Sequence, residues 1–257
     1  MSSGGNSREA YFKRVVESIG VAVGAHLVPQ AEIEVSGNER SQIVRSLNKG
    51  ASEGHRLLPP IPVQHPHHFA GFQDFVRAYV NRFSEPFSQL AGFWYRILTG
   101  FDNGLENQAL VLTTAIEGVL KAYFQSEGQP DEEFLRQVTD AIPKIKELNN
   151  LEPRARERIL STLGNAKNPT PSNALKSLYD LGVIPHPLVT VWKGLRNKAA
   201  HADELNFDSE NIQVFVDQLY ACLELFYRLV FWLVGYSGSI VEYSRCGWPE
   251  VKLEASS

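Results

Sequence analysis

The sequence predicts a mostly α-helical protein with a small N-terminal appendage of mixed α and β structure. From Phe69 onward, apolar residues recur every three or four positions in one segment after another, which is the spacing of a helix face. Alternation of apolar and charged residues, the pattern of a half-buried strand, occurs clearly only near residues 31–35. With 257 residues, 43% hydrophobic and 21% charged, the chain has the composition of a soluble globular protein.

The appendage is expected to comprise residues 1–68. Residues 8–18 have helical spacing, and Ile33 and Val35 alternate with glutamates, which indicates a short strand pair with residues 37–38 as its turn. Residues 36–68 are rich in Gly, Ser, Asn and Pro, so we expect much of this stretch to be irregular. Within it, residues 57–62 are interpreted as an extended linker.

The helical domain is expected to comprise residues 69–257. Its first two helices cover residues 69–83 and 87–98, and they end before Pro86 and at Gly100. Both carry aromatic stripes that could be imagined as platforms for nucleic-acid bases. Their spacing is that of buried helix faces, which favours core packing.

The remaining helices follow from the same periodicity and from capping residues. A long helix covers residues 104–124, and the next begins at Asp131 with a kink or stop at Pro143. A short helix follows Pro153, and another is capped by Ser172 or Asn173. The last expected elements are a helix that begins near residues 185–187, a long helix capped by Asp208 or Ser209, and a short strand at residues 240–243.

Composition and charge limit where this protein works. The apolar run at residues 215–234 contains Asp217, Glu224 and Arg228, so it lacks the ~18 uncharged residues of a membrane span. The first residues resemble a flexible leader rather than a signal peptide. Because Cys222 and Cys246 are too few for a disulfide framework, we expect a cytoplasmic protein.

The strongest chemical signal is an arginine, an amide and a histidine within six residues: Arg196, Asn197 and His201. Arginine carries a permanent charge on a planar fork that suits phosphate oxygens, and histidine exchanges a proton near neutral pH. On a helix, Asn197 and His201 share a face, and Arg196 lies about 100° round the axis. A turn or fraying at residues 199–200 would let all three converge on one phosphate. The alternative is that Arg196 and His201 are ordinary cations at a helix end.

This motif and its setting resemble the HEPN family (higher eukaryotes and prokaryotes nucleotide-binding domain), in particular the Apea-like HEPN group of bacterial defence proteins. The resemblance covers about residues 100–240. It consists of an opening helix at residues 104–124, several shorter helices, the Arg-Asn-x-x-x-His segment, and a long amphipathic closing helix. It implies an HEPN-like α-helical bundle.

The resemblance also implies an activity. HEPN ribonucleases let the ribose 2′-hydroxyl of the RNA attack the adjacent phosphate, which gives 2′,3′-cyclic phosphate and 5′-hydroxyl ends without a metal or other cofactor. Here His201 would transfer the proton, Arg196 would stabilise the developing charge, and Asn197 would orient either group. Family members usually pair, which implies a homodimer with two motifs in one cleft. Since the net charge is −4, the field that attracts RNA must be local, and Lys193 and Lys198 are its candidates.

Two further residues are candidates for supporting roles. Family members often carry a polar residue at the position of Glu117, facing the motif, so Glu117 could hold Arg196 or His201; the alternative is a solvated acid paired with Lys121. Trp192 could stack on a base, although burial beneath the motif is favoured. The histidines at positions 65, 67 and 68 lack a cysteine or carboxylate to complete a zinc site, so no metal is expected.

The sequence therefore predicts a cytoplasmic, metal-independent HEPN endoribonuclease, the effector of a prokaryotic phage-defence or toxin system with an antitoxin or sensor partner. The alternative is a non-catalytic HEPN-like module for RNA or nucleotide binding or for dimerisation. A third reading is the C-terminal effector part of a larger defence protein. The presence of both Arg196 and His201 favours the enzyme, because a degenerate member would often lack one of them.

Overall fold

The computed structural model confirms a mostly helical protein. It describes residues 4–29, 31–36, 39–44, 56–62, 68–201 and 209–253. The helices in these ranges are α1 (Gly4–Val23), α2 (Phe69–Arg82), α3 (Gln89–Gly100), α4 (Leu105–Tyr123), α5 (Glu132–Glu147), α6 (Pro153–Ala166), α7 (Pro171–Asp180), α8 (His186–His201) and α9 (Ser209–Val234).

Two small antiparallel sheets accompany the helices. In the first, β1 (Ala31–Ser36) pairs with β2 (Glu39–Val44). The strand pair predicted from Ile33 and Val35 is therefore confirmed, and the expected turn at residues 37–38 lies outside the described residues. In the second sheet, β3 (Ser239–Val241) pairs with β4 (Glu250–Lys252) near the C-terminus. The short terminal strand expected at residues 240–243 thus forms at residues 239–241.

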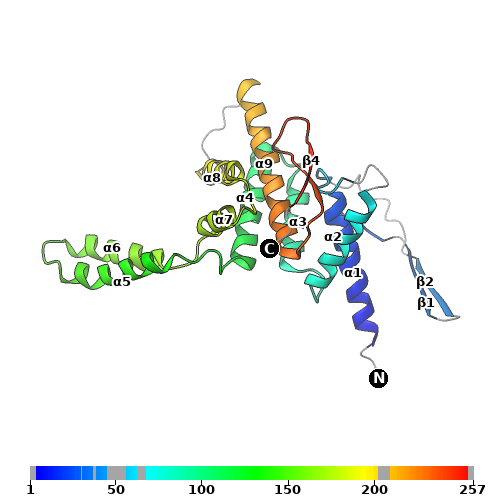
Figure 1. The fold of residues 1–257 in the computed structure, drawn as a ribbon, viewed down its shortest axis with the longest axis horizontal. Helices are drawn as coiled ribbons and strands as arrows, with labels where there is room; N and C mark the ends of the chain where they lie inside the picture. The colour runs from blue at the N-terminus through cyan, green and yellow to red at the C-terminus, as the bar shows by residue number, and fades with distance from the viewer. Residues whose placement is uncertain are drawn as a thin grey trace.

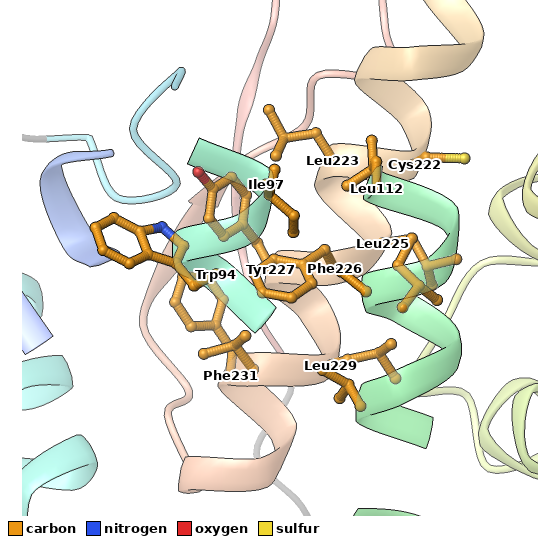
Figure 2. Close-up of a cluster of buried hydrophobic side chains, with 14 of the residues drawn as sticks. Trp94, Ile97, Leu112, Cys222, Leu223, Leu225, Phe226, Tyr227, Leu229 and Phe231 are labelled. Atoms are coloured by element: carbon orange, nitrogen blue, oxygen red, sulfur yellow. The ribbon is translucent and has the colours of Figure 1, made fainter. Parts of the chain in front are cut away.

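Helix α9 is the central element of the fold (Figure 1). Every residue from position 221 to position 231 is buried, so this helix is enclosed on all sides rather than along one stripe. Helices α4 and α8 pack against it, and α3 packs against α4. Figure 2 shows side chains of α9 meeting Ile97 of α3 and Leu112 of α4. Within the described residues, no helix is long and apolar enough to cross a membrane.

A buried ion pair fixes the C-terminal segment to α9. Arg228 Nε donates to Glu224 Oε1, and its Nη2 donates to Glu242 Oε1, both at 2.7 Å. The backbone N–H of Ser244 donates to the other oxygen of Glu224 at 2.9 Å. Because each buried charge has a partner, the charges within the apolar run of α9 are compatible with the core.

The segment at residues 57–62 is extended but is not a solvated linker. Leu57 and Ile61 are buried in the core, together with Val21 and Ala22 of α1. Tyr227 Oη donates to the carbonyl of Leu58 at 3.0 Å, which ties this segment to the middle of α9. The sequence-based division at residue 68 therefore does not coincide with a division of the core.

Two other expectations need correction. Helix α5 continues through Pro143, so of the expected kink or stop at this residue the stop is wrong. The cap of α7 is Thr170, whose hydroxyl accepts a hydrogen bond from the N–H of Asn173 at 3.1 Å, rather than Ser172 or Asn173. Helix α8 is continuous through His201, so the turn or fraying at residues 199–200 that would let the three motif residues converge is not seen in its backbone.

Helices α5 and α6 form a hairpin that projects from the body of the molecule (Figure 1). Val138 is the one described residue of these two helices that is buried. The hairpin lies on the opposite side of α9 from the β1–β2 pair, and both extend away from the core.

Candidate RNA-cleavage site

The motif residues lie on the C-terminal half of α8. This helix packs inward through Leu188, Trp192 and Leu195, which are all buried. Its opposite side therefore faces solvent, and Lys193, Asn197 and Lys198 are exposed there. Arg196 lies between the two sides, with 43% of its side chain exposed.

Arg196 is held by a carboxylate from another helix. Its Nε donates to Glu117 Oε2 of α4 at 2.7 Å, a contact between residues 79 positions apart. Lys121 Nζ lies 2.5 Å from the other oxygen, Glu117 Oε1. Glu117 thus pairs with Lys121 and also bonds to Arg196, but with 19% of its side chain exposed it is not the solvated acid of the alternative interpretation.

The charge of Glu117 follows from these contacts. Its side chain is only 19% exposed, and burial by itself raises the pKa of a carboxyl group. Hydrogen bonds and charges from Arg196 and Lys121 outweigh that burial and lower its pKa below the ordinary value. Glu117 is therefore ionised at neutral pH, with one negative charge between two positive ones.

Trp192 forms the floor beneath Arg196. It is 1% exposed, and its Nε1 donates to the backbone carbonyl of Thr113 in α4 at 3.3 Å. The guanidinium carbon of Arg196 lies 5.7 Å from the centroid of the Trp192 ring, within the range of a cation–π contact. Trp192 is therefore buried beneath the motif, as the favoured expectation had it. Its ring has no exposed face on which a base could stack.

The hydrogen bond that Arg196 makes with a described residue uses one of its three nitrogens. Glu117 uses Nε, and among the described residues none accepts a hydrogen bond from the two terminal nitrogens. These nitrogens can form the planar fork that binds two phosphate oxygens. Glu117 and Trp192 thus orient the guanidinium without accepting hydrogen bonds from its two terminal nitrogens.

The positions of the other two motif residues, Asn197 and His201, follow from the geometry of α8. Asn197 is exposed and precedes His201 by one helical turn, so the two lie on one side of the helix. The backbone of His201 ends α8, while its side chain lies outside the described part of the structure. The structure thus brings Arg196, Glu117, Lys121 and Trp192 together and places Asn197 beside them.

The histidines at positions 65 and 67 lie outside the described residues. His68 is described, and its Nε2 lies 3.1 Å from Glu250 Oε2, which joins the start of α2 to β4. In the part of the chain that the structure describes, no group of three or more His, Cys, Asp or Glu side chains could hold a metal ion.

Sequence reasoning missed a half-buried acid away from the motif. Glu17 of α1 accepts hydrogen bonds from Tyr79 Oη at 2.6 Å and from the N–H of Phe87 at 2.9 Å. Burial raises the pKa of Glu17 despite these bonds. The partners lie 62 and 70 positions further along the chain, and no local pattern signals such a contact.

No family model matches this sequence, and neither does any curated protein or solved structure. The HEPN resemblance of residues 100–240 therefore stays a prediction. The function is argued below from the geometry of the site itself.

Proposed function

We propose that this protein is a metal-independent endoribonuclease of the HEPN type. The observation that carries the proposal is the Arg196 guanidinium, one residue before Asn197 and five before His201. Glu117 and Trp192 fix it, and no described residue accepts a hydrogen bond from its terminal nitrogens. A cation in a fixed position lowers the energy of a charged transition state without reorganising during the reaction.

The reaction uses a nucleophile within the substrate. The 2′-oxygen forms a bond to phosphorus, and the bond from phosphorus to the 5′-oxygen of the next nucleotide breaks. His201 accepts the proton of the 2′-hydroxyl, and a second acid returns a proton to the 5′-oxygen. The products are a 2′,3′-cyclic phosphate and a 5′-hydroxyl, and Arg196 neutralises the charge on the phosphate oxygens.

A homodimer supplies the second acid. One chain has one histidine in the motif, whereas the cleavage uses both a base and an acid. Two motifs related by a two-fold axis would provide both groups in one cleft. Asn197, exposed beside His201, would orient a phosphate or the imidazole, and Lys193 and Lys198 would attract the RNA.

The biological setting belongs to the same proposal. Such an enzyme would act in the cytoplasm as the effector of a prokaryotic phage-defence or toxin system, controlled by an antitoxin or sensor partner. A partner is needed for control because the activity of a ribonuclease without metal or cofactor does not depend on the supply of either.

The test is cleavage of mixed RNA by the purified protein in the presence of EDTA. Fragments with 2′,3′-cyclic phosphate and 5′-hydroxyl ends, absent with Arg196→Ala and His201→Ala, would support the enzyme. Intact RNA under these conditions, with RNA still bound, would favour the second candidate: a non-catalytic HEPN-like module for RNA or nucleotide binding or for dimerisation. One observation fits that candidate: Arg196 Nε bonds to Glu117 of the same chain, which gives the motif arginine a structural role in joining α8 to α4.

A further inference from the structure

A polar groove lies along the boundary between α3 and α4, next to the motif. It consists of two hollows with volumes of about 720 Å³ and 310 Å³, and Arg96 of α3 lines both of them. On α4 the lining runs from Val111 to Ala122, about 17 Å along the helix axis at 1.5 Å per residue. The groove is therefore long enough for several nucleotides of a single strand.

The chemistry of the lining favours an anionic polymer. Its charged side chains are Arg96 and Lys121, and its other polar groups are amides and hydroxyls; none of the described residues that line either hollow is acidic. This is a local exception in a chain whose net charge is −4. The amide and hydroxyl side chains are Gln89, Gln125, Asn103, Ser88, Thr99 and Thr114.

Arg96 is anchored by its own helix. Its guanidinium carbon lies 5.8 Å from the centroid of the Phe93 ring. The Phe93 ring in turn lies directly against Gly118 of α4, where the methyl group of an alanine would collide with it. Close packing of the two helices at Gly118 thus places a stacked arginine at the junction of the two hollows.

Lys121 connects the groove to the candidate site. It lines the larger hollow, and its Nζ contacts the same Glu117 carboxylate that binds Arg196. Arg96, Lys121 and Arg196 therefore form a band of cations across α3, α4 and α8. Since Glu117 is the carboxylate within this band, the band keeps a net positive charge.

We propose that this groove binds the single-stranded RNA that flanks the scissile phosphate, with Arg96 and Lys121 on its backbone phosphates. The inference rests on the proposed function, and it adds the path of the substrate and its single-stranded form. A single strand suits the groove because amides and hydroxyls between the cations can contact sugars and base edges. Binding through charge also explains how an acidic protein would hold RNA.

The experiment measures binding separately from cleavage. A fluorescent 12-nucleotide RNA with 2′-O-methyl groups throughout cannot be cut by 2′-hydroxyl attack, so its fluorescence anisotropy reports affinity alone. Arg96→Ala should weaken binding about three- to tenfold near 0.1 M salt and reduce the salt slope of log K by about 0.7, the value for one phosphate contact to a single strand. Arg77→Ala is the matched control, because Arg77 is also an exposed helical arginine but lies on α2 with Asp74 as its partner.

A second variant tests the far end of the groove. Thr114→Glu places a carboxylate in the smaller hollow and should also weaken binding severalfold through repulsion of a phosphate. Its control is Thr162→Glu on α6, since both threonines are exposed and donate to the carbonyl four residues earlier. Circular dichroism of each variant identifies any loss of folding.

The outcomes separate the two proposals. RNA that is bound in the groove but never cut would overturn the ribonuclease and leave the groove standing. Cleavage by the native chain with unchanged affinity in both Arg96→Ala and Thr114→Glu would overturn the groove alone. A native chain that does not bind the 12-mer, or that binds duplex RNA more tightly, would also overturn it.

Discussion

Glu117 Oε2 accepts a hydrogen bond from Arg196 Nε at 2.7 Å and so joins α4 to α8 at the candidate site. The same carboxylate contacts Lys121 at 2.5 Å. In the proposed ribonuclease Glu117 is therefore a positioning residue, since it would act on a phosphate only through Arg196. The negative charge of Glu117 would also reduce the net positive charge around a bound phosphate. The positive charge of Lys121 compensates for this reduction.

The first prediction concerns this positioning. Glu117→Ala should reduce RNA cleavage about ten- to a hundredfold, because a hydrogen bond to a charged group contributes about 1.5–3 kcal/mol. Glu117→Gln should recover part of that loss, since its amide oxygen can still accept from Arg196. The measurement is kcat and KM on one RNA for both variants. A kcat unaffected by either substitution would rule out the positioning role.

The second prediction concerns the pH dependence of folding. The pKa of Glu117 is lowered in the folded protein, so the free energy that its ionised form contributes is fully present above its ordinary value of 4.5. That contribution should disappear as the pH falls below 4.5 and through the lowered pKa. Urea unfolding of the native chain and of Glu117→Gln should therefore give a constant difference from pH 5 to 7 that shrinks below about 4.5. A difference that grows on acidification would contradict the ion pair.

The third prediction separates chemistry from folding. Arg196→Ala and His201→Ala should each lower kcat by at least about a hundredfold, as expected for loss of a charge-stabilising group or a proton-transfer group. Both should still fold, because α8 is held by Leu188, Trp192 and Leu195, and loss of one hydrogen bond to a charged group, about 1.5–3 kcal/mol, is smaller than the about 5–15 kcal/mol that stabilises a typical domain. Arg136→Ala on the projecting α5–α6 hairpin, where Arg136 pairs with Glu133, is the control for activity. Unfolding of either variant, or cleavage at the native rate, would refute the prediction.

The fourth prediction concerns assembly. The protein should be a dimer in solution with its two α8 C-termini facing each other across the axis. Asn197 is exposed, so Asn197→Cys should form a disulfide between copies under mild oxidation in a Cys246→Ala background, which removes the other exposed thiol. Cys222 can stay, because it is buried and burial raises the pKa of its thiol. A monomer by light scattering, or a dimer that this cysteine cannot crosslink, would exclude the shared cleft.

The positions of the helices could be predicted from the sequence better than their caps and their contacts with distant residues. Periodicity locates α2, α3, α4 and α9 to within a few residues, because one apolar face per helix is a local property. The contact between Glu117 and Arg196 was one of two stated alternatives, and it came from the family resemblance rather than from spacing. Thr170 was missed as a cap because serine and asparagine follow it closely and suit the same role.

The features that escaped prediction depend on distant parts of the chain. Residues 57–62 have the composition of a linker, yet Tyr227 and the β3 segment bond to their carbonyls and draw them into the core. Arg96 belongs to an ordinary amphipathic helix, and only the packing of Phe93 on Gly118 places it beside Lys121. In both cases the partner lies too far along the sequence for any local pattern to identify it.

The last prediction tests the chemistry of the candidate site. If the substrate's own 2′-hydroxyl is the nucleophile, DNA of the same sequence must be inert, because it lacks that group. An RNA with one 2′-deoxy or 2′-O-methyl ribose at the cleavage position should likewise resist, while cleavage at other positions continues. EDTA should leave the rate unchanged, since Arg196 rather than a metal ion would stabilise the charge on the phosphate. The rate should follow a bell-shaped pH profile near neutrality if the His201 residues of two copies act as base and acid. Mass spectrometry of the fragments should find 2′,3′-cyclic phosphate ends. Cleavage of DNA, or full dependence of the rate on added Mg²⁺, would mean that this motif carries out a different reaction.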